Sequence, residues 1–491
     1  MKLLLVQPPQ GARFGLTRIL RVEPLGLECV GGAVRARGYD AELIDLRIDS
    51  WTSLEHALDD QPRAVGISCA FTTDVHPSLE VARFVRERRP DLPVIVGGHH
   101  ASLVPGDFID ATGPVDGVVI GEGEGPMGDV MDGLRDKRSL DAIPGVLTVR
   151  NRDDGYQPHA FSHSFEEMPL PDRSLTARYR RWYHHGFATP SASVETSRGC
   201  PFDCNFCSVW VFYQRRARRR SPASIVHELE GVAEYEVFFT DDIAFLHYDS
   251  YKEMAERILA AGVEKKFSCE TRCDLVIKYR DIFPLWKKAG LHTVFLGVEK
   301  IDDDGLKSVR KRTKGGADSN VQAIEILRDA GITPITSFIT DPAWDDGGFD
   351  RLEDYVERFS LPNPAFTVLT PLPGTELYKE RARDIITHDY AYYDVMHAVL
   401  PTTLPLDRFY ERVAGLYNLS VKTTRLTPTM VARAARMALG GKLWCMRRVY
   451  QAFSEMRTPQ AYLEPPLRVR APDRGAARRG APGKRAASKV A

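Results

Sequence analysis

The sequence predicts an α/β protein: an N-terminal doubly wound parallel sheet, a partial (β/α)6 barrel and a C-terminal helical region. Short, fully apolar runs alternate with helical stretches, and several of these runs end in glycine turns. Strands of a parallel sheet are buried on both faces, so they are apolar throughout. The chain has 491 residues, which is too many for one ordinary core and predicts more than one domain.

The first domain is expected to span residues 1–140. Its strands are predicted at residues 3–6, 41–44, 64–68, 94–96 and 118–120, with helical stretches such as 25–37 between them. Sheets of this kind bind ligands at the carboxyl ends of their strands. Two glycine-rich segments follow strands here, Gly97-Gly98-His99-His100-Ala101-Ser102 and Gly121-Glu122-Gly123-Glu124.

The remaining chain is predicted to hold four parts. A linker rich in Asp, Pro and Arg occupies residues 141–188, and the barrel occupies residues 189–385. A helical domain is expected at 386–462 and a disordered basic tail at 463–491. The barrel strands are expected to begin near Ser191 and to include residues 237–239, 267–269, 293–296 and 334–338.

Composition limits the class of partner. Lys+Arg and Asp+Glu both number 66, so no overall charge attracts nucleic acid, and the basic tail has no aromatic residues for base stacking. We therefore expect no nucleic-acid partner. No apolar run approaches the about 18 residues of a spanning helix, which predicts a cytoplasmic protein. Its eight cysteines are then expected to be reduced thiols or metal ligands.

Three cysteines form the most informative motif. Cys200, Cys204 and Cys207 give the spacing Cys-x3-Cys-x2-Cys just after the first expected barrel strand. Thiolates on a short loop suit a four-iron cluster, and three of them leave one iron open for another ligand. A structural zinc site is the alternative, but zinc needs a fourth ligand. Cys269 and Cys273 are poor candidates because they lie on or just after a strand.

This motif, with Phe206 as its aromatic residue, resembles the signature of the radical SAM family. The resemblance implies a [4Fe-4S] cluster held by the three cysteines. It also implies that S-adenosyl-L-methionine (SAM) binds the open iron and is cleaved to a 5′-deoxyadenosyl radical. Segments after later strands resemble those that meet the cosubstrate, and their polar residues are Asp241, Asp242, Glu270, Arg272 and Glu299. The competing interpretation of these acids is an ordinary strand-end cap, ion pair or turn.

The N-terminal domain resembles the Rossmann-like, cobalamin-binding domain of one branch of that family. Two segments of this chain match the two glycine loops of that domain, and the resemblance implies that they contact cobalamin. The candidate contacts are Gly97, Gly98, His99 and Ser102 in the first loop and Gly121, Glu122, Gly123 and Glu124 in the second. A dinucleotide fingerprint is excluded because Pro126 stands where it needs glycine. The Asp-x-His-x-x-Gly motif that supplies a histidine to cobalt is absent, so we do not expect His99 or His100 to ligate it.

The resemblance implies a C-methyltransferase that passes a methyl group from SAM through methylcobalamin to an unactivated carbon of a lipid or secondary metabolite. Three blocks resemble hopanoid C-3 methylases: Val22–Leu27, Cys207–Tyr213 and His397–Thr402. Antibiotic-pathway enzymes that methylate pyrrole or other aromatic carbons share them, so both substrate classes stay open. Rearrangement or cyclisation without methylation is a further alternative. A non-enzymatic cobalamin-binding protein is disfavoured because it has no use for an open iron.

Two partners are expected besides the small-molecule or lipid substrate. The radical reaction implies an electron donor of the flavodoxin or ferredoxin type. The basic amphipathic segment Met430–Phe453 permits peripheral membrane contact, although packing on the barrel is the favoured interpretation. The sequence leaves the methyl acceptor, the electron donor and the oligomeric state open.

Overall fold

A computed structural model describes residues 1–472, apart from residues 12–13, 162–164, 312, 314–315, 362, 424–427 and 467. Most of the expected disordered tail, residues 473–491, lies outside the described residues. The chain divides into two compact units. Unit 1 holds residues 1–13, 23–182 and the described part of 466–491, and unit 2 holds residues 14–22 and 183–465.

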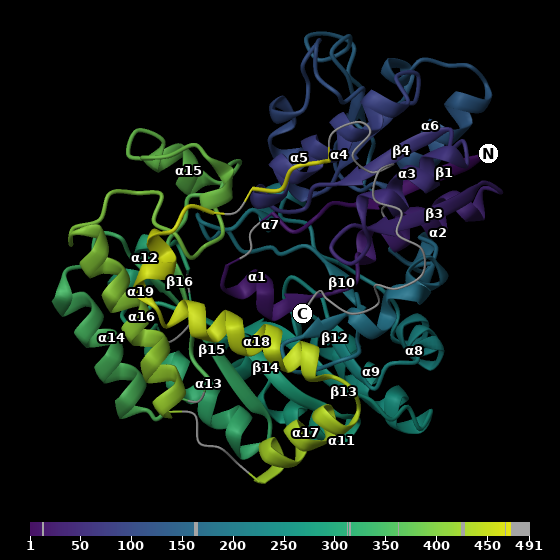
Figure 1. Ribbon diagram of the computed structural model, residues 1–491. Helices are drawn as coiled ribbons and strands as arrows, with labels where there is room; N and C mark the ends of the chain where they lie inside the picture. The colour runs from purple at the N-terminus through teal and green to yellow at the C-terminus, as the bar shows by residue number, and fades with distance from the viewer. Residues whose placement is uncertain are drawn as a thin grey trace. The chain divides into compact units, whose positions relative to one another are not determined.

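Unit 1 contains a six-stranded sheet in the order β3-β1-β4-β5-β6-β7. The chain starts at the inner strand β1, adds β3 on one side and the later strands on the other, which defines a doubly wound fold. Five strands are parallel: β1 (Lys2–Gln7), β3 (Asp40–Asp45), β4 (Ala64–Ser68), β5 (Val94–Gly97) and β6 (Gly117–Val119). Helices α2 (Leu25–Ala36), α3 (Trp51–Asp59), α4 (Val75–Arg88) and α6 (Glu124–Arg135) connect or follow them (Figure 1).

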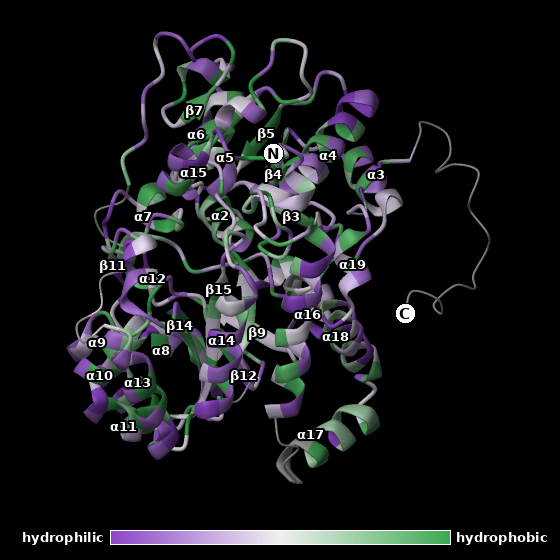
Figure 2. Cartoon of the chain, turned by 90° about the vertical axis from the view of Figure 1, so that its left-hand side faces the viewer, coloured by the Kyte–Doolittle hydropathy of each residue, from purple (hydrophilic) through white to green (hydrophobic). Residues whose placement is uncertain are grey.

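The strands of unit 1 form because their side chains are buried on both faces. Leu3, Leu4, Leu5 and Val6 of β1 are each at most 1% exposed. Burying an aliphatic side chain of this size stabilises the fold by about 1.5–3 kcal/mol. Figure 2 shows hydrophobic residues along the strand near the β5 label, whereas the surrounding helices carry both hydrophobic and hydrophilic residues.

The segment predicted to be a linker contributes to unit 1. Strand β7 (Val146–Leu147) pairs antiparallel with β6, and the 3₁₀ helix η5 (Arg173–Trp182) contacts α2 and β3. Residues 141–182 therefore continue the N-terminal unit. The predicted domain boundaries at residues 140, 188, 385 and 462 stay predictions.

Helices α2 and η5 are joined by a buried charge network. Arg173 Nη1 lies 2.7 Å from Glu23 Oε1, and Arg180 forms a second ion pair with Glu23. Glu28 is fully buried and accepts a hydrogen bond from the hydroxyl of Thr176. Burial, and then the neighbouring charge of Glu23, raise the pKa of Glu28 to about 8.

Unit 2 contains a second six-stranded sheet, in the order β16-β15-β14-β13-β12-β9, and every neighbouring pair is parallel. This arrangement is the expected partial (β/α)6 barrel. The strands are β9 (Ser191–Val194), β12 (Glu236–Phe239), β13 (Lys266–Arg272), β14 (Leu291–Glu299), β15 (Thr333–Thr340) and β16 (Ala365–Val368). The helices between them include α8 (Pro222–Gly231), α9 (Tyr248–Ala260), α11 (Phe283–Ala289), α13 (Asp318–Asp329) and α14 (Asp346–Arg358).

Aromatic residues fill the space between this sheet and its helices. Trp286 of α11 is fully buried, and its ring centroid lies 5.9 Å from Phe239 and 5.7 Å from Phe245, edge to face. Its indole N–H donates to the carbonyl of Tyr251, at 3.1 Å. The largest core residue therefore has both its rings packed and its polar atom satisfied.

The described C-terminal residues between Leu406 and Leu463 lie mostly in four helices. These are α16 (Leu406–Thr423), α17 (Pro428–Leu439), α18 (Leu443–Met456) and α19 (Pro459–Leu463). The preceding residues 386–405, also expected to be helical, instead form an irregular connection with one short 3₁₀ turn at Tyr390–Tyr392. Among the described residues, no helix combines the length and apolar character that crossing a bilayer requires.

Candidate active site

The three cysteines lie on the loop that follows β9, at the carboxyl end of the barrel strand. Asp241, which follows β12, fixes the start of this loop. Its buried carboxylate accepts four hydrogen bonds, from the backbone N–H groups of Thr196 and Ser197 and from the hydroxyls of Thr196 and Tyr251. Asp241 is therefore occupied within the protein and does not line the pocket, unlike the other predicted cosubstrate contacts.

Gly199 allows the loop to turn toward the pocket. Its φ is +91°, and a Cβ atom there would lie 2.0 Å from the carbonyl oxygen of Arg216. Its N–H donates to the carboxylate of Asp242, at 2.8 Å. Only glycine combines this backbone conformation with so close an approach.

Further contacts hold the middle of the loop. The amide of Asn205 donates to the carbonyl of Ser308 at 3.2 Å and to Glu380 at 3.1 Å. The indole N–H of Trp210 donates to the carbonyl of Cys204 at 2.8 Å. The cysteine loop is thus attached to several parts of unit 2.

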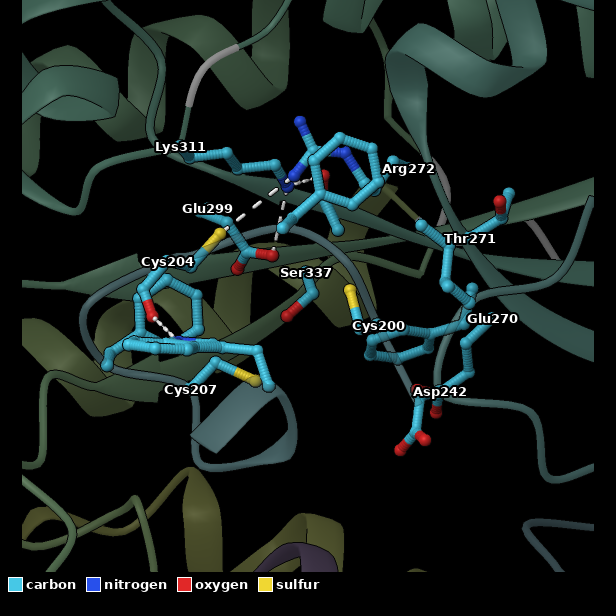
Figure 3. Close-up of a pocket in the computed structure, with 16 residues that line it drawn as sticks. Cys200, Cys204, Cys207, Asp242, Glu270, Thr271, Arg272, Glu299, Lys311 and Ser337 are labelled. Atoms are coloured by element: carbon cyan, nitrogen blue, oxygen red, sulfur yellow. Dashed lines mark hydrogen bonds and ion pairs between the residues drawn. The ribbon is translucent and has the colours of Figure 1, made fainter. Parts of the chain in front are cut away.

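The loop borders a solvent-open pocket with a cavity volume of about 170 Å³. Figure 3 shows the sulfur atoms of Cys200, Cys204 and Cys207 facing a shared space. The described residues hold no group of three or more His, Cys, Asp or Glu side chains placed to hold a single metal ion. The other charged or polar lining residues are Asp242, Glu270, Thr271, Arg272, Glu299, Lys311 and Ser337.

Without a metal, the thiols of the loop are protonated at neutral pH. Burial raises the pKa of Cys200 to about 11 and that of Cys207 to about 12, and it also raises the pKa of Cys204. Metal binding to such thiols must release protons, so it becomes more favourable as pH rises.

Two cations lie beside Cys204. Arg272 Nη1 is 3.9 Å from Cys204 Sγ, and its guanidinium stacks on the ring of Phe202 at 3.9 Å. Lys311 Nζ is 3.1 Å from Glu299 Oε1 and also donates to the carbonyl of Gly297. Positive charge beside a thiolate, or beside a bound carboxylate, is stabilising in such a pocket.

Two acids form the opposite wall. Burial, and then the charge of Asp241, raise the pKa of Asp242 to about 6. The side chain of Glu270 is exposed to the open pocket. Partial desolvation by the pocket walls, followed by the charges of Asp242 and Glu299, raises the pKa of Glu270 to about 7. A cationic ligand beside these two acids would stabilise their ionised forms.

The structure brings most of the predicted barrel residues together. Asp242, Glu270, Arg272 and Glu299 line the same pocket as the cysteines. Sequence reasoning missed Lys311 and Ser337. Lys311 stands in the basic run Arg310-Lys311-Arg312, which marks a charged segment but not its direction. Ser337 is one of several hydroxyl residues in its strand, so nothing in the sequence distinguishes it.

The two predicted glycine loops of unit 1 lie side by side. The hydroxyl of Ser102 donates to the carbonyl of Gly98 at 2.8 Å and accepts from the N–H of Gly121 at 3.0 Å. Both glycines have positive φ, +121° and +90°. The loops follow β5 and β6, so the carboxyl edge of the sheet presents glycine backbone there, while Gly123 and Glu124 begin α6.

The histidines of the first loop take different positions. His99 begins the short helix α5 (His99–Leu103). His100 is buried, and its Nδ1 and Nε2 atoms lie 3.1 Å from the hydroxyl of Thr72 and 2.9 Å from the carboxylate of Asp107. Both ring nitrogens of His100 are thus engaged within unit 1, and the expectation that it does not ligate cobalt stays a prediction.

Comparison with known proteins agrees with this geometry. Residues 15–131 match the family model "B12 binding domain", and residues 194–341 match "Radical SAM superfamily". The hopanoid C-3 methylase of Methylococcus capsulatus is 39% identical over 427 residues, which cover 86% of this chain and 81% of that protein. The hopanoid C-2 methylase of Rhodopseudomonas palustris is 25% identical and covers 73% of this chain and 68% of that protein.

A solved structure shares the fold. The radical SAM methyltransferase TsrM of Kitasatospora setae, with cobalamin and a [4Fe-4S] cluster bound, superposes with a TM-score of 0.65. The match covers 87% of this chain and 89% of TsrM at 17% identity. The chain belongs to the cobalamin-binding radical SAM family. It is a methyltransferase that uses SAM and cobalamin, and it acts on a small-molecule substrate.

Proposed function

We propose that this enzyme methylates an unactivated carbon of a hopanoid. The observation that carries the proposal is the 39% identity to a hopanoid C-3 methylase across 86% of the chain. Carbon–hydrogen bonds of such a lipid are too weakly acidic for a side-chain base, so a radical reaction is the physically suitable chemistry.

Cys200, Cys204 and Cys207 are the proposed cluster ligands. A four-iron cluster is wider than a single ion, so thiols that border a shared space without converging suit it better than zinc. When bound, the cluster and SAM supply a 5′-deoxyadenosyl radical, and cobalamin supplies the methyl group. The loop contacts of Asp241 and Gly199 would hold the three thiols in place.

The charged walls of the pocket suit the amino-acid end of SAM. Arg272 and Lys311 would attract its carboxylate, and Asp242 and Glu270 would attract its ammonium group. Glu299 is held by Lys311 and would position that lysine. In unit 1, the loops at Gly97–Ser102 and Gly121–Glu124 are the proposed cobalamin contacts, because glycine backbone permits close approach of a large ring.

The test uses reconstituted holoenzyme supplied with a hopanoid, and separately with aromatic acceptors. We expect methylated hopanoid, with one 5′-deoxyadenosine and one S-adenosylhomocysteine per product. Alanine at any of the three loop cysteines should remove iron and 5′-deoxyadenosine release, while Cys445→Ala, a buried cysteine on α18, should retain both. Methylation of the aromatic acceptors alone would refute the hopanoid proposal.

We also propose a cytoplasmic electron donor of the flavodoxin or ferredoxin type, because cleavage of SAM consumes one electron. Flavodoxin, its reductase and NADPH should support 5′-deoxyadenosine formation in place of a chemical reductant. No 5′-deoxyadenosine with either protein donor would contradict this.

The C-terminal helices are a proposed membrane contact. Helix α18 buries Cys445 and Val449 in a cluster with Met437 of α17. Outward-facing apolar residues remain on α17 and α18, including Leu439, which is 90% exposed, and Tyr450, which is 72% exposed. Arg436 and Arg447 are also exposed, a combination that suits an anionic lipid surface.

Vesicle flotation tests the membrane contact. The protein should float with vesicles that contain phosphatidylglycerol and less with phosphatidylcholine alone. Leu439→Ser should reduce flotation, and Leu406→Ser, at an exposed position at the start of α16, should not. Equal flotation of all three proteins would remove the proposal.

A further inference from the structure

A buried histidine lies at the carboxyl end of β16, in the segment Asp394–His397. The N–H of Val368, the last residue of β16, donates to the carbonyl of Val395 at 2.8 Å. Active sites of barrels lie at this end of the strands. The cysteine loop follows β9, and β9 and β16 are the two edge strands of the same sheet. The histidine therefore belongs to the opposite edge of the barrel mouth.

His397 and Asp394 form a fixed pair. His397 Nδ1 lies 2.9 Å from Asp394 Oδ2, and the two residues are 2% and 6% exposed. The same carboxylate accepts the backbone N–H groups of Met396 and His397, at 2.9 and 3.0 Å. The turn places Val395 at a φ of +59°, which is strained for a β-branched residue. A carboxylate can only accept here, so Nδ1 carries a proton, and in the neutral imidazole the lone pair then lies on Nε2.

The Nε2 atom of His397 is buried and has no hydrogen-bond partner among the described residues. Four aromatic rings surround the imidazole: Phe14 at 5.2 Å, Tyr392 at 5.4 Å, Tyr462 at 6.2 Å and Tyr410 at 6.3 Å. The hydroxyl of Tyr410 accepts the N–H of Ala398, and that of Tyr462 donates to the carbonyl of Met456. These two tyrosines therefore offer rings rather than hydroxyls to the histidine.

The buried Nε2 atom of His397 is unfavourable unless a bound group donates a hydrogen bond to it. A buried acceptor without a donor destabilises the fold, whereas an apolar ring would fill the same space without that cost. Tyr410 and Tyr462 are fully buried and form the floor, but Phe14 and Tyr392 are only partly buried. The aromatic enclosure therefore reaches the surface on the side of Phe14 and Tyr392.

We propose that His397 Nε2 accepts a hydrogen bond from a hydroxyl group of the methyl acceptor and so selects a hydroxylated substrate. The aromatic rings would contact the apolar frame around that hydroxyl. Asp394 is the positioning residue, because it fixes the tautomer that leaves Nε2 as an acceptor. This inference rests on the proposed hopanoid methylation and specifies which part of the lipid the enzyme recognises.

Two substitutions separate the two nitrogens of His397. In His397→Asn the amide can replace Nδ1 and keep the bond to Asp394, but nothing replaces Nε2. In His397→Gln the longer side chain can bring an oxygen acceptor to the Nε2 position. His227→Asn is the matched control, because this histidine lies exposed on α8.

The holoenzymes are assayed with a hopanoid that carries one hydroxyl group and with the corresponding hydrocarbon. We expect wild type to prefer the hydroxylated lipid in kcat/KM by about five- to tenfold, the size of one neutral hydrogen bond. His397→Asn should lose this preference, His397→Gln should partly restore it, and His227→Asn should keep it. Iron content and Tm report on folding of each variant.

The outcomes separate this inference from the proposed function. If wild type methylates neither hopanoid, the hopanoid proposal fails. If wild type methylates both and His397→Asn, with normal iron content, keeps the wild-type preference, the role of His397 is refuted. A preference that is lost equally in Asn and Gln variants whose Tm values have both fallen would also overturn it, because it would indicate a structural role.

Discussion

Replacing Gly199 by alanine should disrupt the cysteine loop. The φ of +91° costs an alanine about 1–2 kcal/mol. The new Cβ would lie 2.0 Å from the Arg216 carbonyl oxygen, where contacts below 3.0 Å essentially never occur, so the loop or its neighbour must move by about 1 Å. Misplacement by this distance reduces catalysis about 100-fold. We expect iron content and 5′-deoxyadenosine release to fall together, with about 2–4 kcal/mol less unfolding free energy.

Gly262→Ala is the matched control. Gly262 also has a positive φ, +64°, but a Cβ there would meet no atom within 4 Å. This variant carries the backbone strain without the clash, so it should lose about 1 kcal/mol and keep its iron. Iron content, Tm and 5′-deoxyadenosine release are measured for both variants. Gly199→Ala with the iron content and Tm of Gly262→Ala would refute the reasoning.

Three further predictions concern other parts of the molecule. Because the pKa of Glu28 is raised to about 8 from an ordinary 4.5, the folded state binds a proton that the unfolded state releases, and the free energy of unfolding should fall as pH rises from 4.5 through 8. Glu28→Gln should flatten this dependence in urea unfolding between pH 5 and 9; an unchanged slope would contradict the assignment. Lys311→Met should weaken SAM binding by about tenfold, because this variant removes a cation from the pocket, and Lys311→Arg, which keeps the charge, should weaken it by less. Equilibrium dialysis measures both affinities, and affinities equal to that of the wild type would show that the lysine is not a ligand. Trp286→Ala should cost about 3–5 kcal/mol in denaturant unfolding, whereas Tyr235→Ala, at a position that is 54% exposed, should cost less than about 1 kcal/mol; similar losses would mean that the aromatic core is not the main source of stability in unit 2.

Much of the fold could be predicted because parallel strands bury both faces. The apolar runs at residues 3–6 and 237–239 correspond to β1 and β12, and the fold class is confirmed. The last barrel strand, β16, was not predicted, because Ala365-Phe366-Thr367-Val368 is short and contains a polar residue. The expectation of helix from residue 386 is wrong for residues 386–405, which form an irregular connection.

The site followed the same pattern. Residues on strand ends, such as Glu270 and Glu299, could be placed because parallel strands share one carboxyl edge. The adjacent acids Asp241 and Asp242 could not be told apart in sequence, and only side-chain direction separates the loop anchor from the pocket residue. Lys311 follows α12 (Asp303–Ser308), and no periodicity indicates where a loop lysine points.

The route of the chain has a consequence for protein engineering. Residues 14–22 belong to unit 2 although both flanking segments belong to unit 1. Within unit 2, Arg18 forms an ion pair of 2.6 Å with Glu455, and the guanidinium of Arg448 donates to the Arg18 carbonyl at 2.9 Å. A truncation that starts at residue 183 would thus delete a small part of its own barrel unit and uncover α18. Excision or exchange of either half calls for a circular permutation, or for supplying the N-terminal peptide in trans, rather than a single cut.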